Sequence, residues 1–211
     1  MTAPVVLGLS IVAAAAVMLP AQTARVPLFD GKTFAGWEGD TTNTWRIEDG
    51  AIIGGSLTER VPRNDFLVTE REFSDFVLRL QFKLEGTEGF INSGVQFRSQ
   101  RAREPAHEMV GYQADIGAKY WGALYDETRR NVVLAGPDQG AVMQHVRLND
   151  WNEYEIDARG RRIRLTLNGY TTVDYTEPDP SIPQTGRIGL QIHGGGKARV
   201  SFRQITIQEL R

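Results

Sequence analysis

The chain has 211 residues, contains no cysteine and carries a formal net charge of -2, from 24 basic and 26 acidic side chains. The lack of thiols excludes disulfides, thiol catalysis and a lipid-anchored N-terminal cysteine. No block of basic residues occurs, so the sequence gives no sign of binding to nucleic acid or to an anionic membrane.

An apolar segment lies near the start of the chain. Val5–Leu19 consists almost entirely of Val, Leu, Ile, Ala and Met, and Pro20 and small residues follow. A core of this length is typical of a secretory signal and is short for a membrane-spanning helix. We expect residues 1–24 to be a signal peptide and residues 25–211 to be a single domain, with an uncleaved N-terminal anchor as the alternative. The mature protein is then periplasmic or secreted, without stable insertion in a membrane.

Alternation of apolar and polar residues recurs along the rest of the chain, and no window shows the period of an amphipathic helix. The alternating segments are 76–84, 95–98, 112–116, 153–158, 162–167, 190–193 and 200–207. The last segment is expected to be irregular near Arg203-Gln204. Asp49-Gly50 and Asn168-Gly169 predict tight hairpins, because both central positions of such a turn take positive φ. Many short strands joined by turns predict an all-β sandwich or barrel.

Three of these strands place two polar side chains on one face, because residues two apart in a strand point the same way. The pairs are Gln96 and Arg98, Gln113 and Asp115, and Gln191 and His193. If the three strands share one sheet, its polar face offers a guanidinium, a carboxylate, an imidazole and three amides. That set suits a sugar-like ligand. The alternative is an ordinary solvated sheet face.

Two long loops interrupt the pattern of strands, at Gln100–Val110 and Tyr175–Gln184. Long loops in compact domains often form the rims of functional sites. The first loop follows Arg98 and leads into Gln113, so we expect it to overhang the polar face.

A series of short motifs follows in a characteristic order. They are Leu28–Trp37, Trp45–Gly50, Asp75–Arg79, Asn92–Arg98, Gly111–Ile116, Gly122–Tyr125, Trp151–Tyr154, Asn168-Gly169, Leu190–His193 and Val200–Arg203. Together they resemble the 3-keto-disaccharide hydrolase family. The resemblance implies an exported, concanavalin-like jelly roll of two antiparallel sheets, with the three polar strands lining the concave sheet. Many members carry a glutamate where this chain has Tyr112, which by alternation points away from Gln113.

The resemblance also implies a reaction on 3-keto-glycosides. A ketone at C3 acidifies the C2 proton, and its removal gives an enolate that can expel the C1 aglycone. Addition of water then completes a net hydrolysis. Such a route needs a base, an acid and a partner for the enolate oxygen. We expect Asp115 and His193 to transfer protons, in roles that are not assigned between them, and Arg98 to hold the developing oxyanion.

Substrate hydroxyls are expected to meet the amides, which both donate and accept hydrogen bonds. The expected contacts are Gln96, Gln113 and Gln191, with Asn92, Trp121 and Tyr125 at the rim. Two structural alternatives remain open. His193 could pair with Asp115 to shape the sheet, and Arg98 could form a salt bridge to Asp115.

No organic cofactor is expected. A histidine-rich metal site is not expected in a chain with three histidines, whereas an oxygen-ligated calcium or another divalent metal remains open. The expected partner is a small carbohydrate, oxidised beforehand by a glycoside 3-dehydrogenase. The alternative function is a non-catalytic, lectin-like carbohydrate-binding module, because the same sandwich hosts lectins and enzymes.

Overall fold

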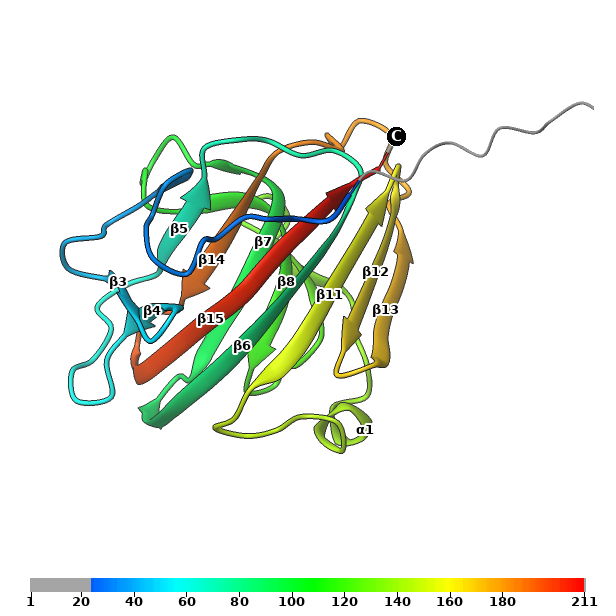
Figure 1. Cartoon of the computed structure of the whole chain (residues 1–211). Helices are drawn as coiled ribbons and strands as arrows, with labels where there is room; N and C mark the ends of the chain where they lie inside the picture. Colours follow the sequence, from blue (N-terminus) through cyan, green and yellow to red (C-terminus); the bar gives the residue numbers. More distant parts are fainter. Residues whose placement is uncertain (1–23, 211) are drawn as a thin grey trace, which may run out of the picture.

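The computed structural model describes residues 24–210 as two antiparallel sheets that pack face to face (Figure 1). In spatial order, the eight-stranded sheet contains β13 (Tyr170–Thr176), β12 (Arg162–Leu167), β11 (Asn152–Arg159), β6 (Phe76–Gly89), β15 (Gly196–Glu209), β4 (Ala51–Gly55) and β3 (Trp45–Glu48), and β1 (Val26–Pro27) pairs with β15. The seven-stranded sheet contains β10 (Val132–Ala135), β9 (Leu124–Glu127), β8 (Met109–Gly117), β7 (Asn92–Arg101), β14 (Arg187–Ile192), β5 (Asp65–Thr69) and β2 (Trp37–Glu38).

One short helix, α1 (Gln139–Met143), departs from the prediction that the domain has no helix. The side chain of Asp138 caps it by accepting a hydrogen bond from the backbone N–H of Ala141 at 2.9 Å. A helix of five residues is too short to produce a periodic apolar pattern, so the sequence could not indicate it.

The core lies between the two sheets, and the alternation along β6 shows how it forms. Leu78, Leu80 and Phe82 are buried, while Arg79 and Gln81 between them are partly exposed. Burial of large apolar side chains is the main favourable contribution to folding. Every strand with this pattern therefore turns one face inward and leaves its other face for solvent or a ligand.

Both predicted hairpins are present. Asp49 and Gly50, between β3 and β4, have φ of +49° and +73°, and Asn168 and Gly169, between β12 and β13, have φ of +47° and +81°. The predicted irregularity in the last strand is also present, because β15 shifts register after Arg203. These turns fix the register of the strands that they join.

The three strands with polar pairs are neighbours in one sheet, in the order β8–β7–β14. Val95 pairs with Ala114 on one side and with Leu190 on the other, and all three face the core. Residues one position away along each strand therefore face outward. Tyr112 points inward as predicted and stacks on Phe97, with ring centroids 5.7 Å apart.

Residues 1–23, nearly all of the predicted signal peptide, lie outside the described residues. Within residues 24–210, no helix has the length and apolar character needed to cross a membrane.

Candidate active site

A small pocket opens on the outer face of the seven-stranded sheet, with a volume of about 130 Å³. It is lined by Phe90, Asn92, Gln113, Asp115, Tyr120, Tyr125, Glu127 and His193. The pocket thus brings together five residues that the sequence singled out, namely Asn92, Gln113, Asp115, Tyr125 and His193.

Asp115 lies on β8 with 4% of its surface exposed. Gln113, two residues earlier on the same face, donates from Nε2 to Asp115 Oδ1 at 3.1 Å. Burial raises the pKa of Asp115 to about 8. The hydrogen bond from Gln113 and the nearby amide of Asn92 act against this rise, and the negative charge of Glu127 adds to it. Asp115 is therefore largely protonated at neutral pH and can serve as a general acid.

Glu127 is a second pocket carboxyl, which the sequence pattern did not predict. It lies on β9 two residues after Tyr125, so the two side chains share the outer face, while Asp126 is buried on the other. Burial raises the pKa of Glu127 to about 7, and the charges of Glu108 and Asp126 add to the rise. The pocket therefore holds two carboxyl groups that gain protons near neutral pH.

His193 directly follows the last residue of β14. Its Nδ1 lies 2.7 Å from the carbonyl oxygen of Gly194. Because a carbonyl oxygen only accepts, Nδ1 carries the hydrogen, and Nε2 of the neutral ring keeps a free lone pair. Phe90 packs edge-on against the imidazole, with ring centroids 4.7 Å apart. This arrangement prepares Nε2 to accept a proton. No hydrogen bond joins His193 to Asp115 in the described part of the chain.

Asn92 opens β7 beside His193 and is 2% exposed. Its backbone carbonyl accepts a hydrogen bond from the N–H of His193 at 3.2 Å. Its side-chain Nδ2 is buried and forms no hydrogen bond of good geometry among residues 24–210, although the amide lies close enough to Asp115 to lower the pKa of that carboxyl. A buried amide without a partner costs free energy, so Nδ2 is available to a polar atom of a ligand in the pocket.

Tyrosines form the aromatic part of the pocket. Tyr120 and Tyr125 meet edge to face, with centroids 6.5 Å apart, and Phe90 lies 6.4 Å from Tyr120. Aromatic side chains with a polar tip combine an apolar face for a sugar ring with a hydroxyl for its oxygens.

The prediction that Trp121 contacts the ligand is wrong. Its side chain is 7% exposed and stacks in the core on Phe82, with ring centroids 6.4 Å apart. Trp121 lies in the turn at residues 118–122, where strand alternation does not decide the direction of a side chain. Its neighbour Tyr120 lines the pocket instead.

The three predicted amides occupy different positions. Gln113 lines the pocket, and Gln96 lies fully buried behind it, donating from Nε2 to Gln113 Oε1 at 3.0 Å. Gln191 is also fully buried, between Phe66 of β5 and Gly94 of β7 in the strand register. Gln96 therefore supports the pocket through Gln113. Gln191 does not line the pocket, and neither polar atom of its side chain has a hydrogen-bond partner within residues 24–210.

Arg98 does not reach the pocket, and the prediction that it points with Gln96 is wrong. A bulge interrupts β7 between Phe97 and Gln100, and Arg98 adopts a φ of +48°. A bulge breaks the alternation of side chains and re-aims the residue that it contains. The sequence alone gave no sign of the extra residue.

The guanidinium of Arg98 is instead buried at one end of the sandwich. It donates to the backbone carbonyls of Ser74 (2.7 Å) and Gly160 (2.6 Å), to Gln184 Oε1 (2.6 Å) and to Asp75 Oδ1 (2.8 Å). The salt bridge of Arg98 is therefore with Asp75 and not with Asp115.

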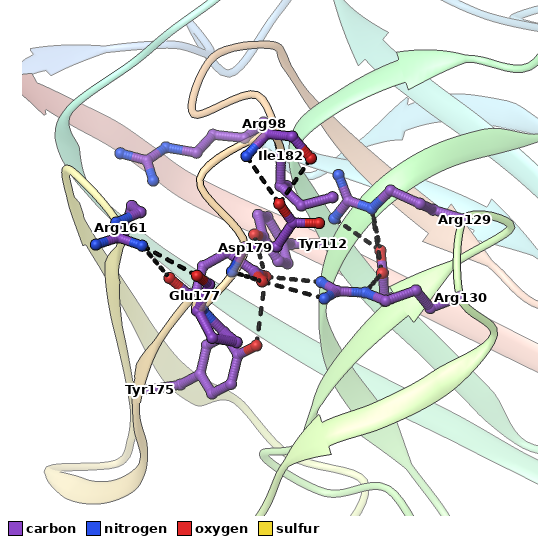
Figure 2. A network of polar contacts seen from close by, with 12 residues as sticks. Arg98, Tyr112, Arg129, Arg130, Arg161, Tyr175, Glu177, Asp179 and Ile182 are labelled. Carbon is purple, nitrogen blue, oxygen red and sulfur yellow. Dashed lines mark hydrogen bonds and ion pairs between the residues drawn. The ribbon is translucent and has the colours of Figure 1, made fainter.

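A polar network at the same end is centred on Glu177 (Figure 2). Tyr112 donates to Glu177 Oε2 at 2.7 Å, and Arg130 donates to both carboxylate oxygens, at 3.1 and 2.7 Å. Although burial opposes ionisation, these hydrogen bonds hold the pKa of Glu177 at about 2. The residue that departs from the family pattern, Tyr112, thus belongs to a structural network behind the site.

The model of the family described as "3-keto-alpha-glucoside-1,2-lyase-like domain" matches residues 24–208. The chain belongs to this family. No curated protein sequence matches it. Within residues 24–210 of this lyase-like domain, no group of three or more His, Cys, Asp or Glu side chains is arranged to hold a metal ion.

Solved structures share the fold of the lyase-like domain at low sequence identity. A proposed glycosyl hydrolase from Parabacteroides distasonis is 22% identical, with a TM-score of 0.64 over 89% of this chain and 100% of that one. The carbohydrate-binding module CBM66 from Bacillus subtilis is 19% identical, with a TM-score of 0.63 over 82% and 96%. A galectin-like protein from Bacillus subtilis is 12% identical, with a TM-score of 0.63 over 90% and 96%. The predicted lectin-like, two-sheet sandwich is confirmed.

The loop between β7 and β8 covers part of the outer face of the lyase-like domain, as the sequence predicted. Met109, where the loop ends, packs in a small apolar cluster with Phe66 of β5. Arg101, where the loop begins, donates from Nη2 to the carbonyl of Phe66 at 2.9 Å. Glu108 lies close enough to raise the pKa of Glu127.

Proposed function

We propose that this lyase-like domain cleaves 3-keto-glycosides by removing the C2 proton and then eliminating the aglycone. The observation that carries the proposal is the pairing in one pocket of an imidazole with a free Nε2 and a carboxyl that holds its proton at neutral pH. An elimination needs a base and an acid at the same time, and these two groups supply them.

The structure supports assigning His193 as the base and Asp115 as the acid. His193 Nε2 takes the proton from C2, and the electron pair forms the enolate of the C3 ketone. The enolate then re-forms the ketone while the C1–O bond breaks and a C1=C2 double bond forms. Asp115 gives its proton to the departing oxygen, so a 3-keto-glycal and a free alcohol result.

The developing charge on the C3 oxygen needs a donor, since Arg98 lies elsewhere. Asn92 Nδ2 fits this role, because it is buried in the pocket lining beside Asp115 and forms no hydrogen bond of good geometry within residues 24–210. A preorganised donor in a site shielded from water stabilises an oxyanion more than solvent does. Tyr120 and Tyr125 offer the sugar ring an aromatic surface.

Hydration of the glycal would complete a net hydrolysis with the same two groups. Water adds its oxygen to C1 while Asp115, now a carboxylate, takes a proton from it. His193 returns a proton to C2, and both side chains regain their starting states. The pocket of about 130 Å³ is smaller than the usual range for ligand sites, about 300–1,000 Å³. It therefore favours a single sugar ring over a long glycan.

We further propose that the protein is exported and uses no organic cofactor. An upstream glycoside 3-dehydrogenase would supply the ketone of its substrate. Trehalose and 3-keto-trehalose are the decisive pair of substrates. The domain should consume only the ketone. Consumption of both sugars would point to ordinary glycoside hydrolysis and would overturn the proposed route.

A non-catalytic carbohydrate-binding module is the second candidate. The pair of tyrosines in the pocket, Tyr120 and Tyr125, and the lectin-like fold favour it. Calorimetry with 3-keto-trehalose separates the two. Binding without turnover by the wild type would favour the module, whereas turnover that Asp115→Asn abolishes would favour the enzyme.

A further inference from the structure

A chain of hydrogen bonds leads from the interior of the sheet to the pocket carboxyl. Ser99 Oγ lies 2.7 Å from Gln96 Oε1, Gln96 Nε2 lies 3.0 Å from Gln113 Oε1, and Gln113 Nε2 lies 3.1 Å from Asp115 Oδ1. All four side chains are at most 4% exposed. In a buried environment such hydrogen bonds strengthen and orient one another.

The direction of the chain follows from its first member. Ser99 Oγ also lies 2.9 Å from the carbonyl oxygen of Phe97 and 3.3 Å from that of Tyr112. The hydroxyl has a single hydrogen for these three acceptors, and its shortest contact is to Gln96 Oε1, which we take as the acceptor. Once Oε1 of Gln96 accepts, its Nε2 must donate, and the same holds for the next amide. Asp115 Oδ1 is therefore the acceptor at the end of the chain.

Glycines make room for these side chains. A Cβ at Gly94 would lie 2.5 Å from the side-chain carbonyl carbon of Gln113, and a Cβ at Gly111 would lie 2.3 Å from Ser99 Oγ. Gly111 also has a φ of +147°, which other residues rarely adopt. The chain of hydrogen bonds thus depends on glycine at two positions of the same sheet.

We propose that Ser99 and Gln96 are positioning residues, which act through Gln113 to direct the pocket-facing oxygen of Asp115 and to set when it holds a proton. With the chain in the observed direction, Oδ1 accepts from Gln113, so the proton of the acid is carried by Oδ2. If the chain reversed, protonated Asp115 would donate to Gln113 Oε1. The direction of the chain and the protonation of Asp115 are therefore coupled. The catalytic meaning of this coupling rests on the proposed function, but the coupling itself does not.

Several other groups face Asp115 and stay unchanged when the chain is altered. Glu127 and Tyr125 come from β9, Tyr120 from the turn after β8, His193 from the end of β14 and the amide of Asn92 from β7. From the opposite sheet, the hydroxyl of Tyr154 donates to the backbone carbonyl of Asp115 at 3.4 Å. A change in the titration of Asp115 after substitution of Ser99 or Gln96 is then traced to the chain.

The test is the pKa of Asp115, followed through its side-chain ¹³C carboxyl resonance in wild type, Ser99→Ala and Gln96→Met. Either substitution removes the fixed direction and lets protonated Asp115 donate to Gln113. The pKa should then rise by about 0.5 to 1 pH unit, the scale of one hydrogen bond. Ser93→Ala is the matched control, because Ser93 is equally buried on β7 and donates to the carbonyl of Gln191 at 2.7 Å, outside the chain.

The titration can contradict the positioning role independently of the proposed reaction. If both variants titrate like the wild type, or if Ser93→Ala shifts the pKa as much, the positioning role is overturned. Using two variants guards against one of them failing to fold. The titration needs no turnover, so it is readable even if 3-keto-glycosides are not substrates. If they are, the pH limb of kcat assigned to Asp115 should move with the titration, whereas a purely structural effect would lower kcat without moving it.

Discussion

Arg98 Nη2 lies 2.8 Å from Asp75 Oδ1, and this ion pair ties β7 to the residue that precedes β6. The guanidinium has no exposed surface and makes three further hydrogen bonds. Arg98→Met should lower the free energy of unfolding by about 1 to 3 kcal/mol, because it removes the four hydrogen bonds of a buried guanidinium to partners that are themselves partly exposed. Urea unfolding measures the loss.

Arg162→Met is the control for this prediction, because its pair with Asp174 is exposed to solvent and should contribute much less to stability than the buried guanidinium of Arg98. If Arg98→Met kept the stability of the wild type but lost turnover, Arg98 would act at the site after all.

Asp115→Asn should stabilise the fold at alkaline pH while it strongly lowers turnover. The pKa of Asp115 is raised in the folded protein to about 8, so the folded state binds a proton that the unfolded chain releases above about pH 4. Stability then decreases as the pH rises from about 4 to 8, and this loss disappears in the variant. We expect a gain of at least about 2 kcal/mol at pH 8.5 and none at pH 4.

Thermal unfolding of both proteins at the two pH values measures this difference. Turnover should decrease at least about a hundredfold, the scale of a general acid. Parallel stability curves for wild type and Asp115→Asn would show that the carboxyl is not held protonated by burial.

Glu177→Gln tests the network of Figure 2 at the opposite end of the pH scale. The pKa of Glu177 is lowered to about 2 in the folded protein, so its contribution to stability is complete above about pH 4.5 and is lost as the pH falls toward 2. The variant should lose roughly 3 kcal/mol at pH 7 and much less at pH 2.5. Chemical unfolding at the two pH values measures both losses. An equal loss at both would mean that ionisation of Glu177 is not what stabilises the network.

Tyr120 and Trp121 are adjacent in sequence and should respond to mutation in opposite ways. Tyr120→Ala removes an aromatic wall of the pocket and should raise KM about tenfold with little change in stability. Trp121→Ala removes a core side chain and should cost about 3 to 5 kcal/mol of stability. Steady-state kinetics and calorimetric unfolding together distinguish the two. A Trp121→Ala protein of normal stability and raised KM would reverse the assignment.

Alternation was sufficient to predict the sheets and the central part of the site. Gln113 and Asp115 lie on a regular stretch of β8, so a period of two placed both on the outer face. Tyr112 directly precedes Gln113 on β8 and therefore points to the opposite face, into the core. Where a strand is regular, the sequence is enough to decide which face a side chain occupies.

The errors fall where the backbone leaves that regularity. Arg98 lies in a bulge, and Trp121 lies in a turn, so neither obeys the period of two. Glu127 was missed because β9 is only four residues long and its sequence, Leu124 to Glu127, is too short for a pattern. Sequence spacing cannot reveal an extra residue in one strand, because the pairing partner lies far away along the chain.

Deuterium exchange at C2 tests most directly whether His193 removes the C2 proton of a 3-keto-glycoside. Wild type, Asp115→Asn and His193→Ala are incubated with 3-keto-trehalose in D₂O, and deuterium at C2 is followed by NMR. Asp115→Asn should still exchange the C2 proton although it cannot expel the aglycone, and His193→Ala should do neither. Exchange by His193→Ala at the rate of Asp115→Asn, with both variants folded, would contradict the account.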